Sequence, residues 1–414
     1  MLSAEVQQQI GQIGPVDIVI GVPSYNHAQT IAPVMEAVRE GLAKYFSQAR
    51  AALVNSDGGS SDGTPELLAG AGWEGPRLFV RHESPPVERV AIPFHGLPGR
   101  AAAQRAILEA ASRLDARACA MIGPDCPTIG PEWIDRLLRP VLESGFDYVS
   151  PLYQRHRYDG SLTNSLIYPL TRAMFGRRVR HPLAGHNALS GRFAARLGAP
   201  EVWRADTARG GIDILTIAIA GAEGFRVCEG WLGPCKTESR GRTADLAGTF
   251  AQAMESVFAV LERTADIWTE VRGSEPVPAF GAELPLGVEP LELNVNRMVR
   301  GFKLGLKDLL PLWEQVLSPE TLAEVLALGP APDEALRFPH DLWASVVYDF
   351  ALGYHFRILH REHLLRSLVP FYLGRTGAFV RETSAGGARG TEGWIERGCV
   401  AFERQKRYLV ERWR

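Results

Sequence analysis

The amino-acid sequence predicts an α/β protein with a doubly wound, mainly parallel sheet and a C-terminal helical domain. Up to about residue 240, short apolar runs alternate with segments of helical periodicity, the pattern of strands connected by helices. From about residue 241 onward, the apolar residues follow helical spacing almost throughout. We therefore expect two domains, residues 1–240 and residues 241–414.

Each expected element follows from a local pattern. Apolar, β-branched runs predict strands at residues 16–22, 51–55, 78–82, 116–122 and 146–153, and the stretches between them predict helices at 31–42, 101–114 and 131–142. The second domain is expected to contain helices at 245–271, 294–317, 319–328, 341–360, 362–380 and 394–414, with a surface loop at 386–393. Aromatic residues of these helices are expected in the core: Trp343, Tyr348, Tyr354 and Tyr372.

Composition excludes several classes of protein. The 414 residues are 46% apolar and 22% charged, which excludes a disordered chain. Lys and Arg number 45 against 47 Asp and Glu, a net charge of −2 that argues against a nucleic-acid partner. The five cysteines show no zinc-binding spacing, so we expect reduced thiols in a cytoplasmic protein.

The chain also lacks the sequence features of membrane insertion. Its first residues contain neither the basic nor the apolar region of a signal peptide. The longest uncharged apolar run, Ile214–Ala222, is too short to cross a bilayer. We therefore expect no membrane span, while homo-oligomer formation stays open.

Polar motifs follow the first two predicted strands. V-P-S-Y-N-H at 22–27 places Pro23, Ser24, Tyr25 and Asn26 at one strand end, and S-D-G-G-S-S-D-G-T at 56–64 places Asp57 at the next. Ligands of doubly wound sheets bind beyond the carboxyl ends of the strands. Either segment alone fits an ordinary turn, but the two at matching strand ends favour a ligand site.

Two further motifs contain charged residues. In L-P-G-R-A-A-A-Q-R at 97–105, Arg100 falls in the first turn of a helix, where it would hold a diphosphate or a carboxylate, or be a surface arginine. In M-I-G-P-D-C-P-T-I-G-P-E-W at 121–133, Asp125 follows the fourth predicted strand.

These motifs resemble those of family-2-like glycosyltransferases of the glycosyltransferase-A fold. In that family the first strand ends P-x-Y-N and the second runs into D-D-G-S-x-D-G-T, whose carboxylate, matching Asp57, reads the nucleotide base. The resemblance implies that the base and ribose rest on Pro23–Asn26 and Asp57. The family places a D-x-D metal motif after the later strand. Here Gly123 replaces the first aspartate and Asp125 matches the second, ahead of a well-matched G-P-E-W-I. The resemblance implies a Mg²⁺ or Mn²⁺ ion that offsets the diphosphate charge.

The middle of the chain resembles the retaining synthases of mannosylglycerate, glucosylglycerate and glucosyl-3-phosphoglycerate. Arg155 and Thr163 match the pair that holds the acceptor's carboxylate in the mannosylglycerate type. The family's P-L-G-G-E loop, which contacts donor sugar and acceptor, becomes Pro182 followed by Leu183, Ala184, Gly185 and His186. By alignment through G-P-C-K-T-E, Glu238 replaces the family's metal-binding histidine, as a second cation ligand or as a solvated loop residue.

Asp213 belongs to the matched G-I-D pattern at 211–213. The resemblance implies contact with acceptor or sugar hydroxyls near the anomeric carbon, and the alternative is capping of the following helix. Arg100 and Asp213 are accordingly the expected catalytic residues.

The resemblance implies a hexosyltransferase that uses a nucleotide-diphosphate sugar and retains the anomeric configuration. We expect a small hydroxy-acid acceptor such as D-glycerate, because Ser161 stands where the phosphoglycerate-using relatives have a phosphate-binding arginine. The alternatives are 3-phosphoglycerate as acceptor, or a nucleotide-sugar-binding protein weakened by the incomplete D-x-D motif. A dehydrogenase is disfavoured, since no G-x-G-x-x-G follows the first strand.

Overall fold

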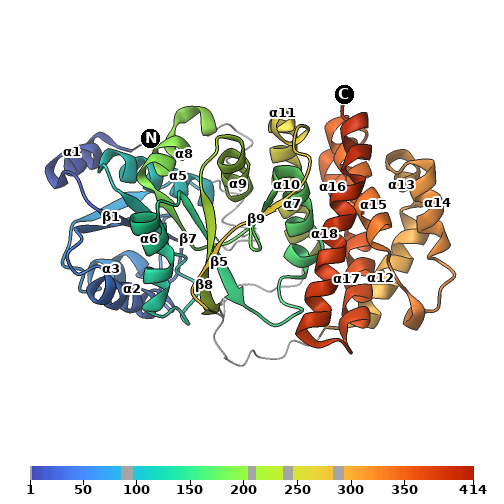
Figure 1. Cartoon of the computed structure of the whole chain (residues 1–414), viewed down its shortest axis with the longest axis horizontal. Helices are drawn as coiled ribbons and strands as arrows, with labels where there is room; N and C mark the ends of the chain where they lie inside the picture. Colours follow the sequence, from blue (N-terminus) through green and yellow to red (C-terminus); the bar gives the residue numbers. More distant parts are fainter. Residues whose placement is uncertain (1, 85–96, 204–210, 236–245, 283–292) are drawn as a thin grey trace. The chain divides into compact units, whose positions relative to one another are not determined.

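The computed structural model describes residues 2–84, 97–203, 211–235, 246–282 and 293–414 (Figure 1). The chain forms two compact units that interleave along the sequence. The sheet unit contains residues 1–154, 179–243 and 276–288, and the helical unit contains 155–178, 244–275 and 289–414. This differs from the single division near residue 240 that the sequence suggested, because residues 155–178 pack with the C-terminal helices.

Over the described residues, the sheet unit is built on eight strands in the order β10-β8-β5-β7-β4-β1-β2-β3. Neighbouring strands pair in parallel except β7, which is antiparallel to both β4 and β5. The strands are β1 (Ile18–Ser24), β2 (Ala51–Asp57), β3 (Arg77–Arg81), β4 (Ala118–Met121), β5 (Tyr148–Gln154), β7 (Asn187–Ser190), β8 (Val227–Pro234) and β10 (Ala279–Phe280). The predicted fold class, a mainly parallel α/β sheet followed by a helical C-terminal part, is confirmed.

Helices cover both faces of this sheet. Every residue of β1 is buried, as expected for a central strand enclosed on two sides. Ile20 packs in the apolar core formed with α2 (Ile31–Tyr45) and α6 (Glu132–Ser144), whereas the next residue, Gly21, faces α5 (Arg100–Arg113). A Cβ added to Gly21 would lie 2.3 Å from Ile107 Cγ2, so glycine lets α5 pack directly on the strand. The helices of this unit are α1 (Ala4–Ile13), α2 (Ile31–Tyr45), α3 (Thr64–Ala69), α5 (Arg100–Arg113), α6 (Glu132–Ser144), α8 (Gly191–Gly198), the short η2 (Pro200–Val202) and α9 (Ile212–Ala222).

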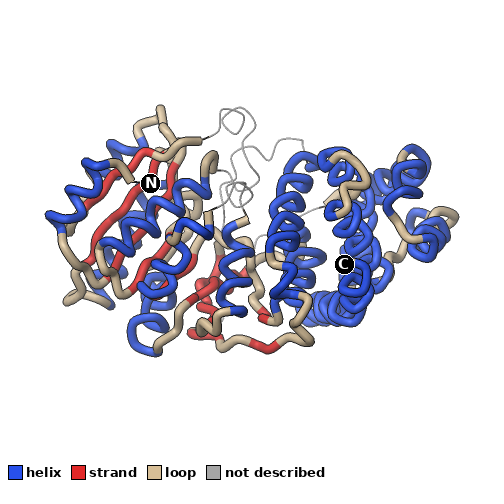
Figure 2. Tube along the Cα trace, turned by 90° about the horizontal axis from the view of Figure 1, so that it is seen from above, coloured by secondary structure: helices blue, strands red, loops and turns tan. Residues whose placement is uncertain are grey.

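The helical unit consists almost entirely of helices (Figure 2). The two-residue strands β6 (Arg177–Arg178) and β9 (Glu275–Pro276) pair with each other. The four aromatic side chains expected in its core are all buried, which confirms that prediction. Its helices are η1 (Thr163–Ile167), α7 (Tyr168–Phe175), α10 (Leu246–Arg263), α11 (Ala265–Trp268), α12 (Val295–Asp308), α13 (Leu310–Val316), α14 (Pro319–Ala327), η4 (Asp333–Ala335), α15 (His340–His355), α16 (Arg361–Ser367), α17 (Val369–Thr383) and α18 (Gly387–Arg412).

The prediction of a loop at residues 386–393 is wrong, because α18 begins at Gly387 and includes most of the glycine-rich stretch. Within this stretch, Thr391 Oγ1 donates to Gly387 O at 3.0 Å. The buried Trp394 and Ile395 anchor the following turn in the core. Packing of that apolar face therefore outweighs the low helix propensity of the glycines.

Within the described parts of the chain, no helix combines the length and the apolar character that crossing a membrane requires.

Candidate active site

The ends of β1 and β2 lie side by side at the carboxyl edge of the sheet. In the parallel register Ser24 pairs with Asp57, so the two polar motifs lie next to each other where the strands end. The Gly58 N–H donates to Ser24 O at 2.9 Å and joins them. The structure thus brings together the residues predicted to hold the nucleotide, Pro23–Asn26 and Asp57. Their nucleotide-binding role stays a prediction.

Asp57 is buried, and its carboxylate accepts four hydrogen bonds from the chain. Oδ1 accepts from the backbone N–H groups of Gly59 at 2.8 Å and Ser60 at 2.7 Å. Oδ2 accepts from the hydroxyls of Ser60 at 2.6 Å and Ser24 at 2.8 Å. A carboxylate offers about four acceptor positions, and these four hydrogen bonds use all of them. Asp57 therefore fixes the shape of this turn. A base N–H would have to replace one of these bonds.

Asn26 and Gly58 set the conformation of the two loops. Asn26 has a left-handed backbone with φ of 54°, which asparagine tolerates better than most residues. Its N–H donates to Ser60 Oγ at 2.7 Å, and its Oδ1 accepts from Ser61 N–H at 2.9 Å. A Cβ added to Gly58 would lie 3.2 Å from Tyr25 Cδ2. Glycine at this position therefore leaves room for the half-buried Tyr25 ring.

Sequence reasoning missed His82, which follows β3 at the same edge. Its Nδ1 lies 3.2 Å from Ser56 Oγ and its Nε2 lies 3.1 Å from Pro98 O. The neighbouring Gly99 has φ of 68°, and a Cβ there would approach His82 Cδ2 to 2.8 Å. His82 thus connects the end of β2 to the turn that begins α5. Its position at the end of a predicted strand was the available signal.

Arg100 begins α5 and forms a buried ion pair with Asp213 of α9. Its Nη2 lies 2.9 Å from Asp213 Oδ2 and 3.2 Å from Oδ1. The same nitrogen donates to Ala184 O at 3.1 Å, and Gln104 Nε2 donates to Asp213 Oδ1 at 3.3 Å. Arg100 is therefore not a surface arginine. Its contacts join three motifs that lie far apart in the sequence.

The electrostatics of this pair depend on burial. Burial raises the pKa of Asp213, and the Arg100 charge and the Gln104 hydrogen bond offset that effect only in part. Either charge left alone in this position would be costly, so each stabilises the other. Asp213 lies in the first turn of α9, where capping was the alternative role, but its described hydrogen bonds are to side chains of α5.

A cavity of about 20 Å³ lies against the ion pair. Its lining includes Gln104, Tyr148, Asn187, Asp213 and Thr216. A space of this size admits about one water molecule, so it is not a sugar-nucleotide pocket.

Position 123, where the resembled family has the first aspartate of D-x-D, is crowded by two side chains. A Cβ added to Gly123 would lie 3.0 Å from Asp125 Oδ1 and 3.4 Å from His186 Nε2. Asp125 and His186 therefore approach the same point just beyond β4. The orientation of His186 is fixed by Tyr153, whose Oη lies 2.7 Å from Nδ1, and by edge-on packing against Trp133.

The described residues contain no group of three His, Cys, Asp or Glu side chains placed to hold a metal ion. Asp125, half-buried, supplies one carboxylate of the kind that Mg²⁺ and Mn²⁺ prefer. Glu238, the second predicted ligand, lies outside the described residues.

The predicted acceptor residues fall in both units. In the sheet unit, Leu183 is half-buried, Gly185 is exposed, and Ala184 and His186 are buried.

In the helical unit, Arg155 and Thr163 flank Gly160: a Cβ added there would lie 3.9 Å from Arg155 Nη1 and 4.0 Å from Thr163 Cβ. The structure brings this predicted pair together. Ser161 Oγ lies 2.6 Å from Tyr372 Oη, so its hydroxyl is engaged by α17.

Sequence reasoning also missed Glu229, a buried carboxylate on β8. Burial raises its pKa to about 7, although the Arg180 N–H donates to Oε1 at 2.6 Å and favours the charged form. Its strand pairs with β5, where Ser150 is the register partner. No sequence pattern distinguishes this glutamate from a solvated one.

Comparison with known proteins finds solved structures that are similar to this chain at low sequence identity. No protein-family model matches the chain, and no curated protein matches it. Solved structures of glucosyl-3-phosphoglycerate synthase from Mycobacterium tuberculosis are similar to it. The complex with Mg²⁺ and UDP is 19% identical with a TM-score of 0.43, over 63% of this chain and 83% of that chain. The complex with Mn²⁺, UDP and glucosyl-3-phosphoglycerate is 20% identical with a TM-score of 0.42, over the same 63% and 83%. A likeness this weak does not assign an activity to this chain.

Proposed function

We propose that this chain is a retaining glycosyltransferase that moves a hexose, glucose or mannose, from a nucleotide-diphosphate sugar to a small hydroxy-acid such as D-glycerate. The observation that supports this best is the buried Arg100–Asp213 pair beside the carboxyl edge of the sheet. Buried charges with perturbed pKa values cluster at functional sites. The pair also joins three motifs that the sequence singled out independently.

In this proposal the donor lies along the loops after β1 and β2. The turn shaped by Asp57 and the segment Pro23–Asn26 both contact the base and ribose. Arg100 faces the diphosphate, and Asp213 contacts sugar or acceptor hydroxyls near the anomeric carbon. The acceptor's proton passes to the leaving phosphate oxygen, so that no carboxylate nucleophile is required. The rate acceleration then comes from positioning and electrostatic stabilisation.

A divalent cation, Mg²⁺ or Mn²⁺, belongs to the proposal. Asp125 fits this cation as one oxygen ligand, because Mg²⁺ sites commonly combine one or two carboxylates with water and substrate phosphates. Glu238 is the candidate for a second ligand. When bound, the ion offsets charge on the diphosphate. Because position 123 is a glycine, Asp125 is the carboxylate that this motif supplies.

Arg155 and Thr163 would hold the acceptor's carboxylate. The hydroxyl of Ser161, bonded to Tyr372, provides no charge for a phosphate, which favours D-glycerate over 3-phosphoglycerate. The alternative acceptor remains 3-phosphoglycerate. The glycine at position 123 is the observation that favours the other alternative, a nucleotide-sugar-binding protein with weakened catalysis.

A panel of GDP-, UDP- and ADP-hexoses against both acceptors tests this proposal. We expect a glycosylated product with D-glycerate, a higher kcat/KM for it than for 3-phosphoglycerate, and loss of turnover on chelation. Nucleotide-sugar binding without product from any combination would overturn the transferase and support the binding protein. Full turnover in chelator would remove the cation from the proposal.

A further inference from the structure

Two cysteines from distant parts of the chain meet beside Asp125. Cys126 Sγ lies 2.7 Å from Cys235 Sγ, and both residues are thiols in the structure. Cys126 lies in the loop after β4, and Cys235 directly follows β8. Both belong to the sheet unit, so this contact is internal to one compact body.

The surroundings hold the two sulfur atoms toward each other. Thr128 Oγ1 lies 3.4 Å from Cys126 Sγ and donates to Pro234 O at 3.3 Å. Thr128 therefore ties the loop that contains Cys126 to the strand end that precedes Cys235. Cys126 is fully buried, whereas Cys235 is half-buried. Cys235 is thus the residue of this pair that solvent partly reaches.

We propose that Cys126 and Cys235 form a reversible disulfide by exchange with a small-molecule disulfide such as oxidised glutathione. The Cys235 thiolate attacks one sulfur of the small disulfide, forms a mixed disulfide and releases one small thiol. The Cys126 thiolate then attacks Cys235 Sγ, and the second small thiol leaves. The protein thiols lose two electrons and two protons in total, and one small disulfide becomes two thiols.

The other cysteines serve as internal references. Cys119, Cys228 and Cys399 are fully buried, and burial raises the pKa of the Cys119 and Cys228 thiols to about 12. These residues are slow to react in the folded chain, because the thiolate is the reactive form.

A consequence for catalysis rests on the proposed function. In the sequence, Asp125 directly precedes Cys126, and Glu238 is the third residue after Cys235. A bridge would link the two segments that contain the proposed cation ligands. Oxidised and reduced protein should therefore differ in the Mg²⁺ or Mn²⁺ concentration needed for half-maximal transfer.

The test is to equilibrate the full chain in glutathione buffers of increasing oxidation, quench with acid, alkylate the denatured protein and map its peptides. We expect loss of two alkylatable thiols, a linked peptide pair containing Cys126 and Cys235, and full recovery after treatment with dithiothreitol. Cys126→Ser and Cys235→Ser should each abolish the link, while the matched variant Cys228→Ser should keep it. If Cys126→Ser does not fold, Cys235→Ser and wild type are sufficient.

Five alkylatable thiols in the most oxidising buffer would overturn the proposal. So would a persistent glutathione adduct on Cys235, or a bridge between other cysteines. The thiol count does not depend on transfer activity. If the bridge forms but the reduced chain has no transferase activity, the missing activity contradicts the proposed function, whereas the disulfide proposal stands.

Discussion

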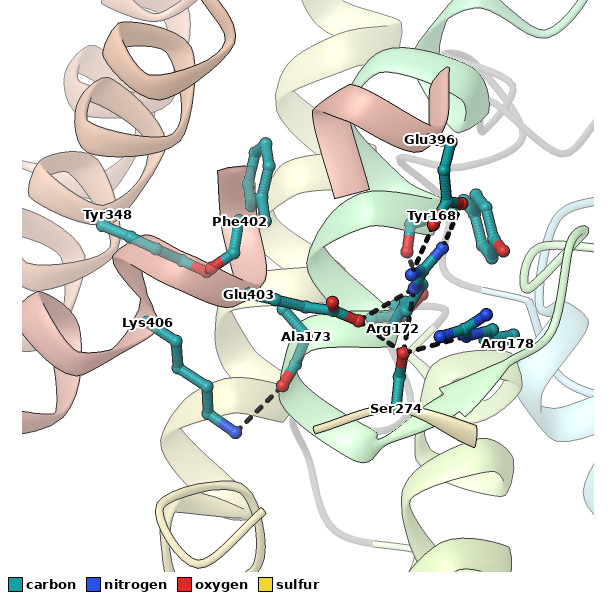
Figure 3. A network of polar contacts seen from close by, with 11 residues as sticks. Tyr168, Arg172, Ala173, Arg178, Ser274, Tyr348, Glu396, Phe402, Glu403 and Lys406 are labelled. Atoms are coloured by element: carbon teal, nitrogen blue, oxygen red, sulfur yellow. Dashed lines mark hydrogen bonds and ion pairs between the residues drawn. The ribbon is translucent and has the colours of Figure 1, made fainter. Parts of the chain in front are cut away.

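Arg100 in the sheet unit and Arg172 in the helical unit are both buried, but their partners differ. Arg172 donates from Nη1 and Nη2 to both carboxylate oxygens of Glu396, at 2.6 Å and 2.9 Å, and from Nε to Glu403 at 2.9 Å (Figure 3). Ser274 Oγ accepts from the same Nε at 3.0 Å. The described contacts of Arg100 all use Nη2 and reach one carboxylate and one carbonyl.

The carboxylates in these two sites also differ in exposure. The side chains of Glu396 and Glu403 are 52% and 23% exposed, whereas that of Asp213 is 6% exposed. Burial acts to lower the pKa of Arg172, but the Glu396 hydrogen bond and neighbouring groups raise it overall. Burial raises the pKa of Asp213 despite its partner. Arg172 therefore joins α7 to α18, whereas the Arg100 pair keeps a carboxylate with a raised pKa near the carboxyl edge of the sheet.

The largest expected effect comes from breaking the sheet-unit pair. Arg100→Ala and Asp213→Ala should each lower kcat by about 10²–10³-fold, because in the proposed function each removes a charge that acts on the reacting groups. The double variant should lose little more than either single variant. Steady-state kinetics would measure this, with Arg105→Ala on the same helix as the control. Unchanged kcat in both single variants would remove the pair from catalysis.

The helical-unit arginine should show the opposite behaviour. Arg172→Met leaves two glutamates without their buried partner and should lower the free energy of unfolding by about 3 kcal/mol. Its kcat, measured well below the melting temperature, should stay within about threefold of wild type, as expected for a change outside the site. Denaturant unfolding with Arg178→Met as the milder control would check this. A loss of kcat without a loss of stability would make the two arginines equivalent.

A third prediction concerns the buried carboxylate of Glu229. Its described hydrogen bond comes from the backbone N–H of Arg180 and not from an arginine side chain. Since its folded pKa is raised from 4.5 to about 7, its contribution to stability is present below pH 4.5 and lost as the pH rises through about 7. Glu229→Gln keeps an acceptor for the Arg180 N–H and stays neutral. It should exceed wild type in unfolding free energy by up to about 3 kcal/mol above pH 8 and match it near pH 4. A difference that does not change with pH would contradict this account.

The smallest expected effect is at Asp57. Asp57→Ala removes the acceptor that holds the Gly59–Ser60 turn and should weaken nucleotide binding about tenfold, within the range for an unmade buried hydrogen bond. Calorimetry with nucleoside diphosphates measures the change, and circular dichroism controls for the fold. Unchanged affinity would separate this turn from the nucleotide site.

The sequence contained enough information for five strands of the sheet and for the placement of its first two motifs. Periodicity predicted β1 to β5, and the parallel arrangement then put Ser24 and Asp57 at one edge. The strands β7, β8 and β10 were not predicted. The glycine-rich start of α18 was mispredicted, because local propensity was overridden by the apolar face that follows it. Prediction was therefore reliable where a pattern is repeated and weak where tertiary packing decides.

The site could be predicted only in part. Arg100 and Asp213 were each singled out, but their pairing joins residues 113 positions apart, which no periodicity reveals. His186 was expected at the sugar, and its approach to Gly123 emerges only from the folded loops. Glu229 has no sequence signal at all, because its raised pKa comes from burial.

The most direct test of the central claim is proton NMR of the wild-type chain with a nucleotide-diphosphate hexose, D-glycerate and Mg²⁺. The account predicts a new anomeric signal of the same configuration as the donor, which grows about 10²–10³-fold more slowly with Arg100→Ala and within about threefold of the wild-type rate with Arg172→Met. An inverted anomeric signal, or no new signal with any donor, would contradict it.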